Sequence, residues 1–103
     1  MNRKKTALTP WDSAALLKTE DDVAAYLDAA LEIAQSENDP AFLVKALGIA
    51  AKAHGMGDIA SETGLGRESL YKALSGDGNP SFATVMKVMA ALGMELHATA
   101  SSH

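Results

Sequence analysis

The sequence predicts an all-α protein that contains a helix-turn-helix, and three observations support this prediction. Hydrophobic residues make up 48% of the 103 residues, but only 5% are aromatic, and alanine, leucine and methionine are abundant. Apolar side chains recur every three to four residues over long stretches, which is the spacing of amphipathic helices. In the second half of the chain, two short helical patterns are separated by the break Gly64-Leu65-Gly66. Together these features favour packed helices over a sheet.

The helix-turn-helix is predicted at residues 56–74, with helices over 56–63 and 67–74. Ala60 is small, so the second helix can cross close over the first. Gly64 opens the turn, where a positive φ costs little in a residue without Cβ. An αα-corner inside a helical bundle uses the same glycine and small-residue pattern, so this alternative stays open.

The outward face of the second helix is the candidate binding site. Leu65 and Leu70 are expected to hold this helix on the body of the domain. The side chains that then face outward are Arg67, Glu68, Ser69, Tyr71 and Lys72. A helix held in this way can lie in the major groove of double-stranded DNA. In the glycine-rich turn that follows, backbone N–H groups and Asn79 are either phosphate contacts or parts of a plain loop.

The net charge of −4 is unusual for a DNA-binding protein. Residues 1–44 hold four basic and eight acidic side chains, whereas residues 45–103 hold five of each. Because phosphate neutralisation supplies most non-specific affinity, the neutral half is expected to bind DNA weakly. The acidic half either attracts a basic partner or is a solvated surface.

Several classes of function are not expected. The chain has no cysteine, so it has no disulfide framework and no Cys-ligated metal. Its basic N-terminus lacks an apolar run, and no stretch reaches the ~20 apolar residues of a membrane span. A cytoplasmic protein without a membrane partner is therefore expected. Three scattered histidines (His54, His97 and His103) and no carboxylate pair beside a nucleophile argue against an enzyme and against a cofactor.

The first long helix is predicted over residues 20–36. Thr19 is placed to cap it, and Asp22 is a shorter capping-box partner than the usual glutamate. The apolar stripe consists of Val23, Tyr26, Leu27, Ala30, Leu31 and Ala34. The opposite face is acidic, with Asp21, Asp28, Glu32 and the nearby Glu37. This face is either exposed to solvent or part of a partner surface.

Two further helices are predicted over residues 40–53 and 81–92. Gly48 lies inside the first of them and lowers its helix propensity by up to ~1 kcal/mol, which indicates the close approach of another helix. His54 follows at its C-terminal end, where we expect a capping role rather than catalysis. Ser81 is expected to cap the last helix and Gly93 to end it.

The predicted domain organisation is simple. Residues 1–10 are expected to be flexible, residues 11–93 to form a single helical domain, and residues 94–103 to form a tail. Trp11 is expected to pack on the core rather than to contact a partner. Residues 94–99 alternate between apolar and polar side chains, which is a strand pattern. A lone strand needs a partner, so the tail either pairs with the same tail of a second copy or is unstructured.

The chain resembles the addiction-module antidote proteins, which are the antitoxins of toxin–antitoxin pairs with small RelE/HigB-like toxins. The resemblance extends from Trp11 to Gly93. Its most specific part is the run from Arg67 to Pro80, which includes Arg67-Glu68-Ser69-Leu70-Tyr71-Lys72-Ala73-Leu74 and Gly78-Asn79-Pro80. It implies a five-helix, phage-repressor-like (lambda-repressor-like) DNA-binding domain with an N-terminal helical extension. It also implies a homodimer that binds its own double-stranded DNA operator and neutralises a cognate small basic RNA-cleaving toxin.

The resemblance also implies residue roles and shows two departures from the family pattern. Arg67, Glu68 and Lys72 match base-facing positions, and a bidentate contact of Arg67 with guanine is worth ~1–3 kcal/mol of discrimination. Ser69 and Tyr71 flank these residues and are expected to reach the DNA backbone. Gly66 and Met56 stand where relatives often have a hydroxyl residue and a phosphate-contacting glutamine, and both changes are expected to lower affinity.

Two alternative functions stay open. One is a stand-alone helix-turn-helix repressor without a toxin partner. The other is a protein-interaction module that has lost DNA binding. The neighbouring reading frame distinguishes the first alternative from an antitoxin, because an antitoxin is expected beside a small, strongly basic protein.

Overall fold

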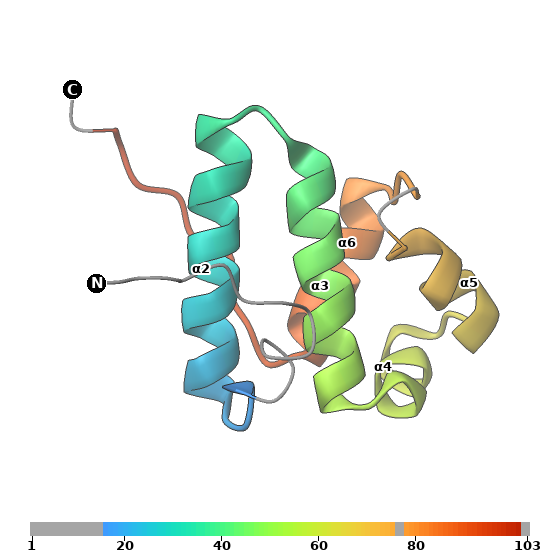
Figure 1. The fold of residues 1–103 in the computed structure, drawn as a ribbon. Coiled ribbons are helices and arrows are strands. Elements are labelled where there is room, and N and C mark those ends of the chain that lie inside the picture. Colours follow the sequence, from blue (N-terminus) through green and yellow to red (C-terminus); the bar gives the residue numbers. More distant parts are fainter. Residues whose placement is uncertain (1–15, 76–77, 102–103) are drawn as a thin grey trace.

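The computed structural model describes residues 16–75 and 78–101, and within these ranges the chain forms five helices and no strand (Figure 1). The all-α prediction is therefore confirmed for this part of the chain. The helices are α2 (Glu20–Ser36), α3 (Pro40–His54), α4 (Met56–Thr63), α5 (Arg67–Ala73) and α6 (Phe82–Ala91). The predicted flexible N-terminus and the packing role of Trp11 lie outside the described residues. In the described ranges, no helix is long and apolar enough to cross a membrane.

Helices α2 and α3 form an antiparallel hairpin, and the remaining helices pack on the other side of α3 (Figure 1). Helix α3 contacts α4 and α6, and α4 contacts both α5 and α6. As a result α2 and α5 lie at opposite sides of the molecule (Figure 1). The two surfaces that the sequence marks as candidate partner sites are thus well separated.

A single hydrophobic core joins all five helices. Each helix contributes a fully buried side chain: Leu27, Leu47, Ile59, Leu70 and Val88. Alanines fill the spaces where helices approach closely, among them Ala46, Ala50 and Ala51 of α3. Because α4 and α5 both belong to this core, this pair of helices is part of the packed domain rather than an appendage.

The N-terminus of α2 is held by a complete capping box. The Thr19 hydroxyl accepts a hydrogen bond from the Asp22 N–H at 3.1 Å, and Asp22 Oδ2 accepts one from the Thr19 N–H at 2.9 Å. Asp22 Oδ2 also accepts a bond from the Lys18 N–H at 3.0 Å. These two backbone donors, Thr19 first and then Lys18, hold the pKa of Asp22 below its ordinary value of 3.8. Aspartate is therefore long enough for this role.

Asp22→Asn is expected to make the stability of the domain less dependent on pH in acid. A lowered pKa in the folded state stabilises the protein above the unfolded pKa, and this contribution is lost as the pH falls through the folded pKa. Urea unfolding of both proteins at neutral pH and in acid measures the effect. The difference in unfolding free energy between wild type and Asp22→Asn should shrink as the pH is lowered below 3.8. An unchanged difference would contradict the role of the charged carboxylate.

The other helix ends lie within one residue of their predicted positions. Gly64 caps α4 in the left-handed conformation with φ of 77°, and the Ser81 hydroxyl caps α6 by accepting from the Thr84 N–H at 3.1 Å. Helix α3 ends at His54, and its C-cap is Gly55. His54 was expected to be the cap, but it is the last residue of the helix. Helix α5 ends at Ala73, and Leu74 is its C-cap. Helix α6 is one residue shorter at each end than the predicted range 81–92, because Ser81 and Leu92 are its caps.

Gly48 confirms the predicted close approach. A Cβ at this position would lie 2.7 Å from the backbone oxygen of Leu74, at the end of α5. The buried residue Gly48 thus allows the end of α5 to rest directly on α3. This contact is one of those that fix the orientation of α5.

Gly48→Ala is expected to destabilise the domain by ~1–3 kcal/mol, because a backbone oxygen cannot move aside as a flexible side chain would. Gly57→Ala is the matched control, since a Cβ there meets nothing within 4 Å. In the control, alanine should stabilise α4 by ~0.5–1 kcal/mol. Chemical denaturation of the two variants measures both effects. Equal stability of the two variants would show that α5 does not press on α3.

Residues 94–101 form no strand in the single chain, so pairing of the tail with a second copy stays a prediction. The Met94 N–H still bonds to the Met89 oxygen at 2.9 Å, which continues the end of α6. Beyond it, the tail follows α2 as an irregular segment (Figure 1). The alternating pattern is insufficient here because a strand needs a partner strand to satisfy its backbone hydrogen bonds.

Candidate nucleic-acid interface

The turn between α4 and α5 is fixed by hydrogen bonds as well as by Gly64. The Gly64 N–H donates to the Ala60 oxygen at 3.0 Å. The Thr63 hydroxyl donates to the Ile59 oxygen at 2.8 Å and accepts from the Leu65 N–H at 3.2 Å. Thr63 therefore ties the end of α4 to the turn. Sequence reasoning missed this role, although a hydroxyl residue directly before a helix-ending glycine was a usable signal.

The inward face of the corner is apolar, as predicted. Ile59 and Leu70 are fully buried, and Ala60 is 8% exposed. Leu65 is half-buried and packs against the core from the turn. These contacts fix the rotation of α5 about its own axis, so the positions around Leu70 on the other side of the helix must face solvent.

The predicted outward residues of α5 are all exposed: Arg67, Glu68, Ser69, Tyr71 and Lys72. Even the largest of them, Tyr71, is 43% exposed. Helix α5 therefore presents a polar edge of two cations, one carboxylate, one hydroxyl and one phenol. Such an edge has both the hydrogen-bonding groups that read base edges and the cations that meet phosphates.

A further cation lies beside this edge. The Nζ atom of Lys52, near the end of α3, is 5.9 Å from the centre of the Tyr71 ring. At an exposed site, such a cation–π contact is worth ~0.5–1 kcal/mol. Lys52 thus adds a positive charge beside Tyr71, at the exposed edge of α5. Helical spacing did not indicate it, because the contact joins residues from different helices.

The chain returns tightly across the end of α5. A Cβ at Gly78 would lie 2.7 Å from the Ala73 backbone oxygen and would also meet the Lys72 oxygen. This close approach requires a residue without a side chain. It leaves Asn79 exposed just beyond the end of α5. The Asn79 side chain is therefore accessible to a partner.

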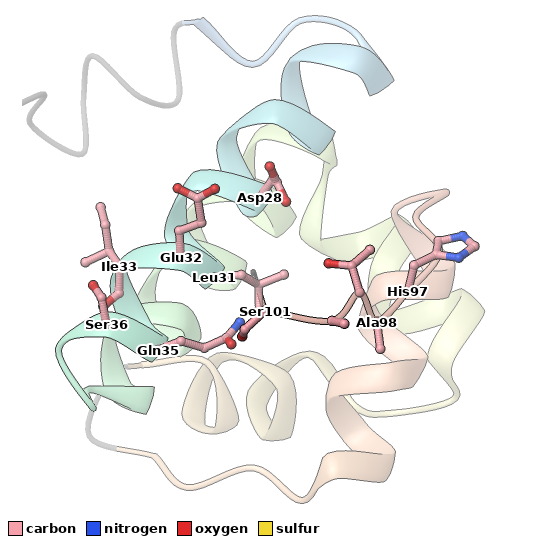
Figure 2. Close-up of a pocket in the computed structure, with 11 residues that line it drawn as sticks. Asp28, Leu31, Glu32, Ile33, Gln35, Ser36, His97, Ala98 and Ser101 are labelled. Atoms are coloured by element: carbon pink, nitrogen blue, oxygen red, sulfur yellow. The ribbon is translucent and has the colours of Figure 1, made fainter. Parts of the chain in front are cut away.

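The acidic surface lies elsewhere. Asp21, Asp28, Glu32 and Glu37 are all exposed, and the first three are on α2, which has no lysine or arginine. Figure 2 shows the open hollow between α2 and the tail, with Asp28 and Glu32 on the helix and Ala98 and Ser101 on the tail. Its volume is about 910 Å³. Leu31 and Ile33 give it an apolar part, so it can accept a segment that is both cationic and apolar.

In residues 16–75 and 78–101, no group of three or more histidine, aspartate or glutamate side chains is placed to hold a metal ion. The only ion pair of a histidine found there joins His97 Nε2 and Glu95 Oε1 at 3.1 Å, on the exposed tail.

Comparisons with known proteins place this chain in a family. A family model described as "Probable addiction module antidote protein" matches residues 7–100. An uncharacterised protein of Haemophilus influenzae is 48% identical over 88 residues, which cover 85% of this chain and 87% of that protein. No solved structure matches the chain. Nearly the whole chain is thus covered, and it belongs to the family of probable addiction module antidote proteins.

Proposed function

We propose that the protein is an antitoxin that represses its own operon as a homodimer and neutralises a cognate small basic RNA-cleaving toxin. Membership of the antidote family supports the antitoxin role. One observation carries the DNA-binding role: α5 is anchored by the fully buried Leu70 while its five neighbouring polar side chains are exposed. In this proposal the domain is of the phage-repressor-like type.

For DNA binding, α5 enters the major groove. Arg67, in the first turn, bonds to a guanine edge, and Glu68 either accepts from a cytosine or orients Arg67. Lys72 and Lys52 neutralise phosphates, while Ser69, Tyr71 and Asn79 bond to the DNA backbone. Because the whole chain carries a net charge of −4, each copy binds weakly, and two linked copies are needed for useful affinity.

For toxin binding, the acidic face of α2 is the proposed surface. Asp28 and Glu32 border the hollow between α2 and the tail, which also offers Leu31 and Ile33 as apolar contacts. A basic toxin is attracted to such a surface, and complementary charge speeds the encounter. Helices α2 and α5 lie at opposite sides of the molecule (Figure 1), so both partners can bind at once.

A protein-interaction module without DNA binding is the second candidate function, and the burial of Met56 favours it. Met56 is only 6% exposed and belongs to the core, so it cannot replace a phosphate-contacting glutamine. Gly66, the N-cap of α5, has no hydroxyl to offer to a phosphate. Both observations lower the expected affinity for DNA without affecting the α2 surface.

The test combines two measurements on the full-length protein. In a mobility-shift assay, the protein should retard the DNA upstream of its own gene, with an affinity that falls as salt is raised. Co-expression with the neighbouring gene should give a complex on size exclusion. Retardation without a complex would indicate a stand-alone repressor. A complex without retardation at low salt would indicate the interaction module.

A further inference from the structure

The tail after α6 has an anchored start and an exposed remainder. Gly93, with φ of 81°, turns the chain beside the Glu20 side chain at the start of α2, and Met94 packs against the core. The last backbone hydrogen bond found in the described tail joins the Met94 N–H to the Met89 oxygen at 2.9 Å. Residues 95–101 are all exposed. When extended, this segment spans ~23 Å at ~3.3 Å per residue, which is longer than an average strand.

Side chains of the tail already follow the two-residue period of a strand. Leu96, Ala98 and Ala100 alternate with polar residues. The carboxylate oxygen Oε1 of Glu95 lies 3.1 Å from Nε2 of His97, so these two side chains, two residues apart, lie on the same side of the backbone. The tail therefore has an apolar side and a polar side without being part of a sheet in the described chain.

We propose that the tail adds as a strand to an open sheet edge of the basic toxin. This inference rests on the proposed function, because that function supplies the toxin. In β-strand addition, the backbone N–H and C=O groups of an extended segment bond to the unpaired edge of a partner's sheet. The exposed backbone of the tail gives up only water to make these bonds. Leu96, Ala98 and Ala100 then lie on one face of the enlarged sheet and cover apolar surface of the toxin.

Charge favours the toxin over the tail of a second copy as the partner. The hollow of about 910 Å³ between α2 and the tail is bordered by Asp28 and Glu32 (Figure 2). Neighbouring strands lie ~4.8 Å apart, so a strand that pairs with this side of the tail enters the hollow. Its lysine and arginine side chains are then attracted to the two carboxylates. Residues 94–103 have no lysine or arginine, and pairing two tails on this side would bring two acidic α2 faces together.

The toxin is thus held by two contacts of different chemistry. Helix α2 contributes charge, which salt screens, whereas the tail contributes backbone hydrogen bonds, which depend less on salt. Neither contact uses a residue of α4 or α5. Changes in the tail should therefore weaken toxin binding and leave operator binding intact.

The first test introduces single prolines into the tail of the full-length protein, where every position is exposed and folding should be unaffected. The variants are His97→Pro, Ala98→Pro, Thr99→Pro and Ala100→Pro. Successive N–H groups of a strand point to opposite edges, so proline removes a bond to the toxin only at every second position. Binding to the basic protein encoded by the neighbouring gene, measured by calorimetry, should fall by about tenfold at one alternate pair. The other pair is the matched control and should change binding much less.

Four outcomes decide between the possibilities. Normal binding by all four variants, or an equal loss in all four, would overturn strand addition while leaving the antitoxin role in place. A wild-type protein that does not bind the neighbouring protein would remove the proposed antitoxin function and this inference with it. Prolines that abolish self-association in light scattering but spare toxin binding would assign the tail to a second copy instead.

The second test detects the backbone bonds directly, by amide hydrogen exchange on isotopically labelled full-length protein. In the free protein the amides of residues 95–101 should exchange rapidly, because they are exposed. In the complex with unlabelled toxin, alternate amides should exchange about tenfold more slowly or less, as expected for a segment that is bonded along one edge. Unchanged exchange along the tail, or equal protection of every amide, would contradict the addition of a strand.

Discussion

Arg67→Ala is expected to weaken binding to the operator by roughly 5- to 150-fold per half-site, the range that corresponds to a loss of ~1–3 kcal/mol. Arg67 is the first residue of α5, and its side chain is exposed. A guanidinium at this position can bond to both acceptors of a guanine, whereas alanine leaves them unpaired. In a dimer the loss occurs twice, so binding should become undetectable at moderate salt.

The control for this prediction removes the same charge at a distant site. Lys18 is exposed and is separated from the start of α2 by Thr19. Helix α2 lies at the opposite side of the molecule from α5 (Figure 1). Lys18→Ala should leave operator binding nearly unchanged in the same mobility-shift assay. Arg67→Lys keeps the charge but loses the planar fork, so it should restore non-specific affinity without specificity.

Toxin binding should survive Arg67→Ala, because the acidic α2 face and α5 are separate surfaces. Capture of the toxin by the variant, measured beside its circular dichroism spectrum, checks this expectation. Loss of both activities in a folded variant would contradict the division into two surfaces. If the variant kept both operator binding and toxin binding, residues other than Arg67 would make the DNA contacts.

The helix boundaries were largely predictable because the residues at the helix ends are of types that cap helices. Thr19 and Ser81 each offer a hydroxyl to the N–H three residues later, and Gly64 supplies a left-handed backbone. These are local interactions between residues close in sequence. They can be predicted from the sequence alone, which explains why the observed helix ends differ from the predicted ones by no more than one residue.

Contacts between distant segments were less predictable. The sequence indicated that something approaches Gly48 but not that it is the Leu74 oxygen, and it gave no sign of the contact between Lys52 and Tyr71. Both depend on how α3 and α5 cross, which is set by the packing of the whole core. The tail also depends on a distant partner: its alternating pattern describes a side-chain preference, whereas a strand also requires a second backbone.

The outward side chains of α5 were predictable because one residue determines them. Once Leu70 is buried, the rotation of a seven-residue helix is fixed, and the polar positions beside it face solvent. What each side chain contacts could not follow from the same argument, since this depends on the partner. Exposure is thus a property of the chain, while base recognition stays a prediction.

Leu70→Ala is expected to cause the largest loss of stability, ~2–5 kcal/mol, because Leu70 is fully buried and its truncation leaves a cavity. Domains of this size are stable by only ~5–15 kcal/mol, so a loss of ~5 kcal/mol would remove at least about a third of the stability. Its melting temperature should fall by ~4–8 °C for each kcal/mol. Urea and thermal unfolding followed by circular dichroism measure both quantities.

Leu16→Ala is the matched control, because Leu16 is 56% exposed and its truncation leaves no cavity. It should change the unfolding free energy by less than ~0.5 kcal/mol. Leu70→Ala should also weaken operator binding at temperatures where it is still folded, because the cavity lets α5 rotate and misaligns Arg67. Equal stability of the two variants would mean that α5 does not pack on the core. Normal operator binding by a destabilised Leu70→Ala would mean that the anchoring of α5 stabilises the fold but does not aim the helix at DNA.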